Sequence, residues 1–275
     1  MPGTAVQGQV PQHGTATQCH EPGPARRIRR VPRHLARLVG PRTQRRRSPI
    51  VLQIGAKTPF QAREGAGLQV AQTHAGVVVA LAAAYQGPTF RIGPGEGLES
   101  IHLWFGDERF VAAGLTDRND LLAADLVRAG VPEGNVHRLS GPEEGIGVED
   151  AAARLAAELV AAGPEGASFD VVHLGVGPDA HVCSLFPGHP AARVIGADVV
   201  AVRSSPKPPP ERVSLTFDAL HRARCIMLAA SGEGKARAVR AGLGEPDAVR
   251  APASCARGLT TTWYIDDAAA GRLEG

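Results

Sequence analysis

The amino-acid sequence predicts an α/β domain with a mostly parallel β-sheet over residues 99–275, preceded by an atypical region over residues 1–98. Two observations support this fold class. From about residue 100 onward, short apolar segments of strand type alternate with segments of helix type, which is the pattern of successive βα units. One of the strand-like segments, residues 170–174, is largely apolar and rich in β-branched residues, as expected for a buried parallel strand.

The region 1–98 gives weak signals for secondary structure. Residues 1–48 show no strand or helix periodicity, whereas residues 48–54 fit a brief strand. Residues 73–85 are apolar and rich in alanine, and they fit either a helix or a buried strand. Residues 86–97 contain four glycines and two prolines, so we expect a loop there.

In the following third of the chain the periodicity predicts a strand, a helix, a short strand and a second helix, at residues 101–105, 116–129, 135–139 and 148–162. Thr116 or Asp117 would cap the first helix, which would turn Leu121 and Leu126 inward. The second helix is clearly amphipathic, and a Gly-Pro pair after it provides the stop.

The last third continues the alternation. We expect strands at residues 170–174, 198–202, 224–230 and 261–265, and helices at residues 216–221 and from about 235 to 242. Residues 204–212 contain three consecutive prolines, which exclude a helix interior or a central strand and predict a stiff exposed loop. Residues 252–255 are expected to be a loop.

The strand at residues 170–174 leads into a turn that carries a histidine. Gly175, Gly177 and Pro178 force the turn, and Asp179, Ala180 and His181 follow. Ligands of open α/β sheets bind at the carboxyl ends of the strands, so this histidine is well placed for chemistry. Its position alone fits a partly buried loop histidine equally well.

Charged residues follow other predicted elements. Asp107, Glu108 and Arg109 come directly after the strand at 101–105, either as a solvated strand end with an ion pair or as a functional cluster at the edge of the sheet. Lys207 and Arg212 bracket the proline-rich loop, and on their own they would be read as ordinary solubilising residues.

The net charge of +3 is unevenly distributed. Residues 1–50 contain ten arginines against the single acid Glu21, whereas the rest of the chain is acidic. A basic arm on an acidic body suggests nucleic-acid binding. However, these arginines lie among Pro, Gly, Gln and His without interleaved aromatic residues, a composition more typical of disorder. We therefore expect no nucleic-acid partner.

The sequence also argues against a membrane or metalloprotein. Its longest apolar run, residues 75–85, is shorter than the roughly 20 residues of a membrane helix, and we recognise no secretory signal. The four cysteines are scattered, so we expect free thiols, no zinc site and a cytoplasmic location.

Several segments, in this order, resemble the 6-phosphogluconolactonase family of actinobacterial type. They are Trp104 to Val111, Asp117 to Asn119, Phe169 to Gly188, Ser205 to Thr216, Ser231-Gly232 with Lys235-Ala236, and Trp263 to Asp266 with Ala268-Ala269. The resemblance covers about residues 101–272. It implies a Rossmann-like sheet flanked by helices, and an enzyme that hydrolyses 6-phospho-D-glucono-1,5-lactone to 6-phosphogluconate in the oxidative pentose phosphate pathway, without a cofactor.

The resemblance also implies roles for site residues. His181 would be the general base that deprotonates the attacking water, and Asp179 would orient His181 or shape the turn. Arg109, Lys207 and Arg212 would pair with the substrate's phosphate, or Arg109 would face the developing oxyanion. Gly175 and Gly177 would form the substrate-binding turn, whereas no residue is expected to bind a metal.

Two departures from the family pattern keep other functions open. Ala180 stands where the family usually has glycine, which would strain the turn by about 1 kcal/mol if φ is positive there. The family's Gly-Gly loop, which follows an early strand, is not found in residues 1–98. We hypothesise that this region is not the family's native first segment, and that another reading frame upstream of Ile101 encodes that loop. The alternatives are a glucosamine-6-phosphate deaminase-like isomerase and a non-catalytic sugar-phosphate binder.

Overall fold

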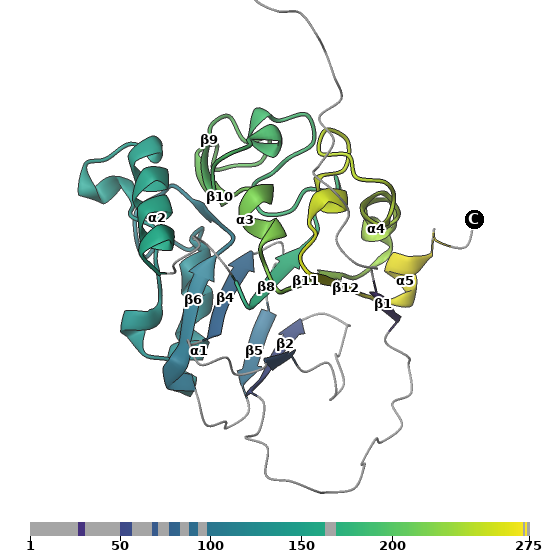
Figure 1. Ribbon diagram of the computed structural model, residues 1–275, viewed down its shortest axis with the longest axis horizontal. Coiled ribbons are helices and arrows are strands. Elements are labelled where there is room, and N and C mark those ends of the chain that lie inside the picture. The colour runs from purple at the N-terminus through teal and green to yellow at the C-terminus, as the bar shows by residue number, and fades with distance from the viewer. Residues whose placement is uncertain are drawn as a thin grey trace, which may run out of the picture.

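A single parallel sheet forms the centre of the molecule (Figure 1). The computed structural model describes residues 27–30, 50–56, 68–70, 77–82, 88–92, 98–162, 169–271 and 273. Six strands lie in the order β1-β12-β11-β8-β4-β6, and all neighbours are parallel. They are β1 (Arg27–Arg30), β4 (Val77–Ala82), β6 (Ile101–Phe105), β8 (Val171–Gly175), β11 (Cys225–Ala230) and β12 (Thr260–Ile265). The expectation of a mostly parallel α/β fold is confirmed.

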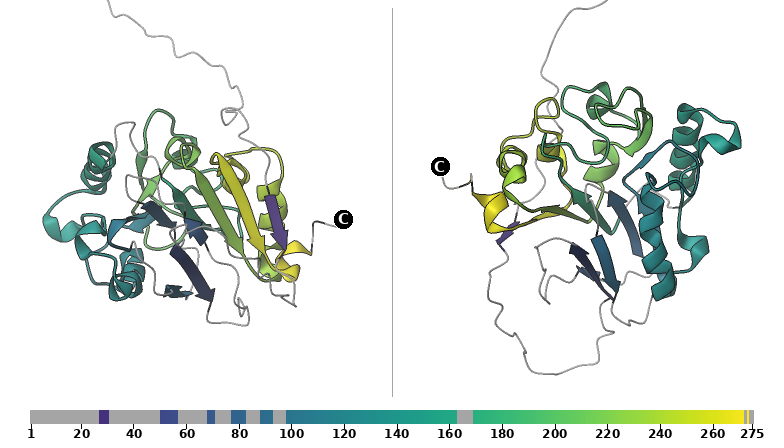
Figure 2. Two further views of the ribbon diagram at one scale, coloured as in Figure 1. Left: turned by 60° about the horizontal axis from the view of Figure 1, so that its bottom comes forward. Right: turned by 180° about the vertical axis from the view of Figure 1, so that it is seen from behind.

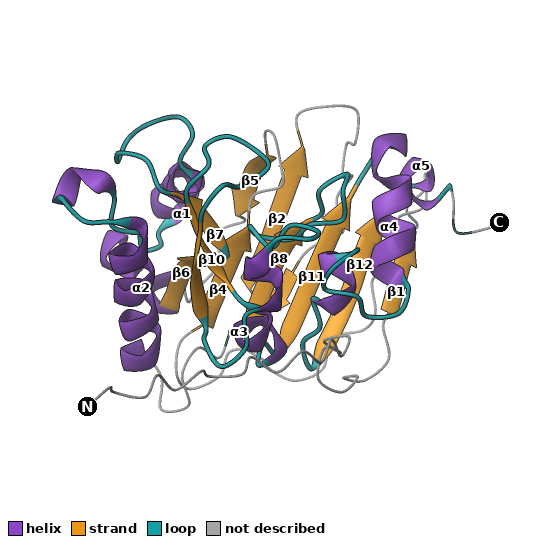
Figure 3. Ribbon diagram, turned by 90° about the horizontal axis from the view of Figure 1, so that it is seen from above, coloured by secondary structure: helices purple, strands orange, loops and turns teal. Residues whose placement is uncertain are grey.

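Helices cover both faces of this sheet (Figure 3). On one face lie α2 (Val148–Ala162), α3 (Phe217–His221), α4 (Ala236–Leu243) and α5 (Asp267–Ala270), and on the other lies α1 (Ala123–Ala129). A three-stranded sheet of β3 (Leu68–Val70), β2 (Ile50–Ala56) and β5 (Pro88–Ile92) lies on the α1 side, as the turned views in Figure 2 also show. Short 3₁₀ helices span Leu98–Ser100, Asn119–Leu122, Glu133–Asn135, Pro142–Glu144, Pro190–Arg193, Glu233–Lys235 and Pro252–Cys255.

The position of β8 in the middle of the main sheet explains why its sequence is apolar. Val172 and Leu174 belong to the larger core cluster under α2 to α5, whereas Val171 belongs to the smaller cluster under α1. Side chains of a strand alternate between the faces of its sheet, and both faces of β8 are covered. Apart from His173, the strand is therefore apolar on both faces instead of alternating.

A second, antiparallel sheet lies at the carboxyl end of β6. It consists of β7 (Asp107–Arg109), β10 (Arg212–Leu215) and β9 (Val199–Val202), with β10 in the middle. β7 follows β6 after Gly106, whose carbonyl accepts a hydrogen bond from the Leu215 amide at 2.8 Å. This small sheet brings the proline-rich loop before β10 to the edge of the main sheet.

Most predicted elements of residues 99–275 agree with the structure. The helix at 148–162 has the predicted bounds, and Thr216 caps α3 with its side-chain oxygen at 3.4 Å from the Ala219 amide. The segment 48–54 contains most of β2, and the segment 73–85 contains β4, so the strand alternative is the correct one.

Three expectations are wrong, two of them because pairing with a distant strand decides the structure. β5 lies in the expected loop at 86–97 and pairs with β2. β1 lies in the aperiodic segment 1–48 and pairs with β12. The expected strand at 135–139 is absent from this described segment, because Pro132 and Gly134 shape a 3₁₀ turn and only Val136 bridges Leu103.

The helix expected from residue 116 or 117 begins later. A 3₁₀ turn at Asn119–Leu122 precedes α1, and Arg118 occupies the cap position without a side-chain cap. The first amides of this 3₁₀ turn, those of Asn119 and Asp120, donate to the distant carboxylate of Glu108 instead of to a local cap. The helix ends at Ala129 as expected, but the tighter first turn leaves Leu121 46% exposed.

The cysteines depart from expectation at one position. Cys183 and Cys225 are free thiols, but Cys255 is disulfide-bonded, so the prediction of free thiols is wrong for Cys255. Among the residues that the structure describes, no helix combines the length and the apolar character needed to cross a membrane.

Candidate active site

The turn after β8 is fixed by its own backbone hydrogen bonds. The Gly177 amide donates to the His181 carbonyl at 2.9 Å, and the Ala180 amide donates to the Gly177 carbonyl at 2.9 Å. Ala253, from the segment after α4, donates its amide to the Ala180 carbonyl at 2.8 Å. Ala180 has φ +66°, which confirms the left-handed conformation suspected from the sequence.

Asp179 and His181 form a hydrogen-bonded pair on this turn. His181 Nδ1 lies 2.5 Å from Asp179 Oδ1, and His181 is only 8% exposed. Burial alone would raise the pKa of Asp179, but the hydrogen bond and charge of His181 and the charge of Lys207 outweigh it and hold that pKa well below its usual range. Asp179 is therefore an ionised acceptor at neutral pH. An ionised acceptor at this distance favours the tautomer with the proton on Nδ1, which leaves a lone pair on Nε2.

Gly177 makes room for this pair. A Cβ atom at position 177 would lie 1.9 Å from His181 Nδ1 and 2.4 Å from Asp179 Oδ1. Real Cβ atoms do not approach other atoms so closely, so a larger residue would displace the pair. The glycine predicted as part of the substrate-binding turn thus also has a definite steric role.

Two lysines lie around the turn. Lys207 Nζ lies 3.5 Å from Asp179 Oδ1 and 3.3 Å from His181 Nδ1. Lys235 Nζ donates to the carbonyl of Val176 at 2.6 Å, and burial, followed by the charge of Lys207, lowers the pKa of Lys235. The sequence predicted Lys207 but gave Lys235 no role, although Lys235 stands in one of the segments that carried the family resemblance.

The ring of Phe186 lies beside three of the predicted residues. Its centroid is 4.5 Å from the His181 ring centroid, 5.9 Å from Lys207 Nζ and 5.7 Å from Arg212 Cζ. Phe186 is completely buried. Cations at such distances from an aromatic ring are attracted by its quadrupole. His181 and two cations therefore share one buried aromatic neighbour, which sequence reasoning missed.

Arg109 is held by one edge of its guanidinium. Its Nη1 donates to the Asp117 carbonyl at 3.0 Å and also to the side-chain oxygen of Asn119. Its Nε is buried and has no hydrogen-bond partner within the described part of the chain. A buried donor without a partner is costly and points to a missing acceptor.

Glu108 anchors the segment that holds Arg109. Its carboxylate accepts the backbone amides of Arg109 at 2.8 Å, Asn119 at 2.8 Å and Asp120 at 2.9 Å. Burial raises the pKa of Glu108 to about 7, although these hydrogen bonds and the charge of Arg118 oppose the shift. The sequence placed Glu108 in a charged cluster but could not show that it binds the backbone amides of a helical turn that begins 11 residues later in the chain.

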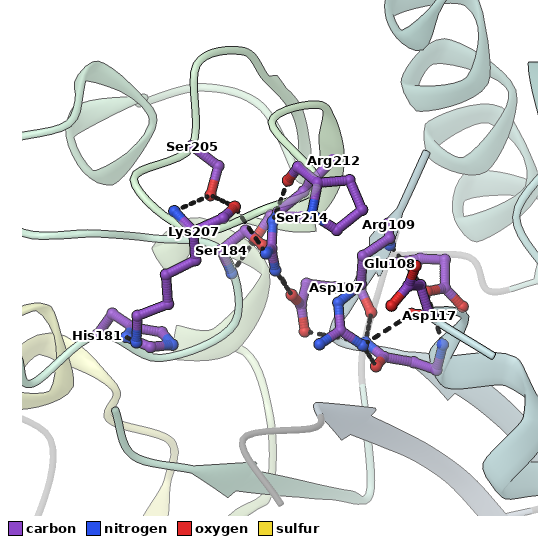
Figure 4. Close-up of polar contacts among 12 residues, drawn as sticks. Asp107, Glu108, Arg109, Asp117, His181, Ser184, Ser205, Lys207, Arg212 and Ser214 are labelled. Atoms are coloured by element: carbon purple, nitrogen blue, oxygen red, sulfur yellow. Dashed lines mark hydrogen bonds and ion pairs between the residues drawn. The ribbon is translucent and has the colours of Figure 1, made fainter. Parts of the chain in front are cut away.

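Asp107 connects the remaining segments (Figure 4). Its Oδ2 accepts a hydrogen bond from the Ser184 hydroxyl at 2.7 Å and lies 3.8 Å from Arg212 Nη1. Arg212 is only 5% exposed, although it was expected on an exposed loop. Burial lowers the pKa of Arg212, and the charge of Asp107 opposes that effect.

The structure thus brings Asp179, His181 and Lys207 into direct proximity, with Gly175 at the end of β8 just before them. Arg212 and Arg109 lie farther along the same edge and are joined to this group through Asp107 and Asn119. Within the described ranges, no group of three or more His, Cys, Asp or Glu side chains has the geometry to hold a metal ion.

The chain matches known proteins over the region that contains this site. The model of the family described as glucosamine-6-phosphate isomerases/6-phosphogluconolactonase matches residues 79–263. This match also takes in residues of β4, upstream of the segment 101–272 on which the resemblance rested. A 6-phosphogluconolactonase of Streptomyces coelicolor is 45% identical over 183 residues, which are 63% of this chain and 70% of that protein.

Solved structures agree with the fold. The crystal structure of devB protein matches this chain with a TM-score of 0.63 and 27% sequence identity. The match covers 74% of this chain and 90% of the devB chain. The 6-phosphogluconolactonase of Thermotoga maritima matches with a TM-score of 0.57 and 25% sequence identity. This match covers 70% of this chain and 86% of the Thermotoga chain. On the family match and these relatives, the chain belongs to the family of glucosamine-6-phosphate isomerases and 6-phosphogluconolactonases.

Proposed function

We propose that the protein hydrolyses the ring ester of 6-phospho-D-glucono-1,5-lactone to give 6-phospho-D-gluconate, the second step of the oxidative pentose phosphate pathway. The observation that carries this proposal is the Asp179–His181 pair at the end of the central strand, with Lys207 beside it. The Streptomyces relative, which bears the name 6-phosphogluconolactonase, supports the same activity.

In the proposed reaction, His181 Nε2 takes a proton from a water molecule that attacks the lactone carbonyl carbon. The ionised Asp179 fixes the ring of His181 and stabilises the imidazolium that forms. When the tetrahedral intermediate collapses, the carbon–oxygen bond of the ring breaks, and the imidazolium returns its proton to the departing ring oxygen. General base catalysis of this kind contributes roughly 10²–10⁴-fold.

The substrate carries a phosphate dianion, and its carbonyl oxygen becomes negative in the transition state. Arg109 is the best-supported partner for one of these anions, because its buried Nε has no acceptor among the residues that the structure describes. Lys207 and Lys235 provide two further positive charges close to the turn. Gly175 and Gly177 remain predicted parts of the substrate-binding turn, and a cytoplasmic location without nucleic-acid partners remains a prediction from the sequence.

Proton release from the lactone tests the proposal. The purified full chain should accelerate acidification of a weakly buffered solution of the phosphorylated lactone above its spontaneous rate, which is measured in parallel. The unphosphorylated lactone should be hydrolysed with a kcat/KM lower by about 10²-fold or more, because a phosphate held by paired cations contributes several kcal/mol.

Two results would overturn this proposal. One is a rate equal to the spontaneous rate at every enzyme concentration, which would favour the reading of a non-catalytic sugar-phosphate binder. The other is release of ammonia from glucosamine 6-phosphate without lactone hydrolysis, which would assign the chain to the isomerase branch of its family.

A further inference from the structure

We propose that Arg212 is a positioning residue: it holds the main chain of the loop 205–212 so that Lys207 stays beside His181, and it does not itself bind the substrate. This inference rests on the proposed lactone hydrolysis. It assigns different roles to two cations that the sequence could not distinguish. Lys207 lies at the reacting groups, whereas Arg212 fixes the loop that carries Lys207.

Two of the three guanidinium nitrogens of Arg212 donate hydrogen bonds to the protein's own main chain. Its Nε donates to the Pro209 carbonyl at 3.1 Å, and its Nη2 donates to the carbonyls of Pro208 at 2.9 Å and Lys207 at 3.0 Å. The remaining nitrogen, Nη1, faces the carboxylate of Asp107 at 3.8 Å. The planar guanidinium thus gathers three successive carbonyls of one loop, which a lysine ammonium cannot do with the same geometry.

The loop is fixed most firmly at Lys207 itself. The Lys207 carbonyl accepts a hydrogen bond from Arg212 Nη2 and a second one from the Ser205 hydroxyl at 2.9 Å. The Ser205 oxygen also accepts the Lys207 amide at 3.3 Å. The backbone of this residue is therefore held on both sides, while its side chain reaches out to Asp179 and His181.

The other side of Arg212 is tied to the histidine turn. Asp107, which faces Arg212, accepts the hydroxyl of Ser184, three residues after His181. Phe186 packs its ring against both Arg212 and His181. Arg212 thus lies between the loop that carries Lys207 and the segment that carries the base, and it can set the spacing between them (Figure 4).

Arg109 provides the contrast. Its Nε is buried and has no hydrogen-bond partner among the described residues, as expected of a cation that binds an anion. By contrast, Nε and Nη2 of Arg212 both donate to main-chain carbonyls, and Nη1 faces Asp107. Arg212 is also nearly inaccessible, at 5% exposure. These differences distinguish a binding arginine from a positioning arginine within one site.

A double-mutant cycle tests the inference on the full chain. We measure kcat/KM for the phosphorylated lactone in the wild type, Arg212→Lys, Lys207→Met and the double variant. Arg212→Lys should reduce kcat/KM by roughly 10- to 10²-fold, since a displacement of about 1 Å has effects of this size. In the Lys207→Met background, the same substitution should reduce kcat/KM by less than about threefold, because the ammonium group that Arg212 positions is no longer present.

Two further variants keep the test independent of folding. Ser205→Ala removes the other hydrogen bond on the Lys207 carbonyl and should reduce kcat/KM in the same direction, by a few-fold. Arg203→Met removes an exposed arginine of the neighbouring strand end, paired with Glu149 and Glu211, and should leave kcat/KM unchanged. Thermal unfolding of each variant identifies any loss caused by a smaller folded fraction.

The outcomes separate this inference from the proposed function. If the wild type does not hydrolyse the lactone, the proposed function fails first. If the wild type is active but Arg212→Lys costs the same factor with and without Lys207, Arg212 acts on the substrate directly and the positioning role is wrong. An Arg212→Lys variant that is folded and fully active contradicts it as well.

Discussion

Gly177 is the residue whose side-chain size matters most for the Asp179–His181 pair. Gly177→Ala places a Cβ where His181 Nδ1 and Asp179 Oδ1 now lie, so we predict a loss of at least 10²-fold in kcat/KM. Steady-state hydrolysis of the phosphorylated lactone measures the loss. Gly134→Ala is the matched control, because its Cβ would meet nothing within 4 Å. Equal activity of the two variants would show that the pair has another arrangement.

Asp179 fixes the tautomer of the base in this account. Asp179→Asn removes the charge that accepts the proton on His181 Nδ1, so the ring loses its fixed orientation and its imidazolium loses a counterion. We predict that kcat falls by roughly 10²-fold or more while KM changes little, measured over a range of lactone concentrations. A large rise in KM with unchanged kcat would instead assign Asp179 to substrate binding.

At the scale of elements, the start of the helix after residue 118 depends on Glu108 more than on a local cap. The folded protein keeps a proton on Glu108 up to a pKa of about 7, whereas the unfolded chain loses it near the ordinary value of 4.5. Between these values the folded state binds more protons, so this group's contribution to stability falls as pH rises.

Substitution of Glu108 isolates that contribution. The free energy of unfolding of the wild type, relative to Glu108→Gln, should fall by up to about 3 kcal/mol between pH 4.5 and pH 7. Denaturant titrations at several pH values measure the difference. A difference that stays constant over this window would mean that Glu108 is ionised at its ordinary pKa.

The elements that could be predicted from the sequence are those with local signals. α2 has the predicted bounds because its apolar positions recur with helical spacing and a Gly-Pro pair follows it. β1 and β5 were missed because their structure comes from pairing with distant strands, β12 and β2. Long-range pairing leaves no trace in four or five residues of sequence.

The site divides in the same way. His181 and Asp179 were predictable because two glycines, a proline and a strand end mark their turn. Arg212 is buried, Phe186 packs against His181, and Glu108 accepts the Asn119 amide only because distant segments meet in the folded chain. The role of Lys235 was within reach of the sequence, since its segment already matched the family.

At the scale of the whole molecule, a second buried group opposes the pH effect of Glu108. Burial lowers the pKa of His173, on the central strand, to about 4, and its Nε2 has no partner in the described part of the chain. Between pH 4 and the ordinary value of 6.5 the unfolded chain binds more protons than the folded one. The stability that depends on a neutral His173 is therefore present above pH 6.5 and is lost as pH falls.

His173→Leu should remove this acid sensitivity. We predict that the wild type loses up to about 3 kcal/mol relative to His173→Leu when pH is lowered from 6.5 to 4, measured by denaturant unfolding. Because Glu108 acts with the opposite sign over nearly the same range, the pH dependence of the wild type should be shallower than that of either single variant. A steeper dependence in the wild type would refute this balance.

Whether residues 1–98 are the family's native first segment concerns the whole molecule. The family match begins at residue 79 and the main sheet includes β4, so part of that region is integrated with the rest of the fold. Reading the other forward frames of the gene upstream of Ile101 tests whether a strand followed by a Gly-Gly loop is encoded there. The hypothesis fails if none of those frames encodes it.

Turnover and binding by His181→Ala test most directly whether the Asp179–His181 pair is the catalytic centre. We predict that this variant loses at least about 10²-fold in kcat for the phosphorylated lactone, while its affinity for the product, 6-phosphogluconate, measured by calorimetry, stays within a few-fold of the wild type. Wild-type turnover in His181→Ala would contradict the assignment of the Asp179–His181 pair as the catalytic centre.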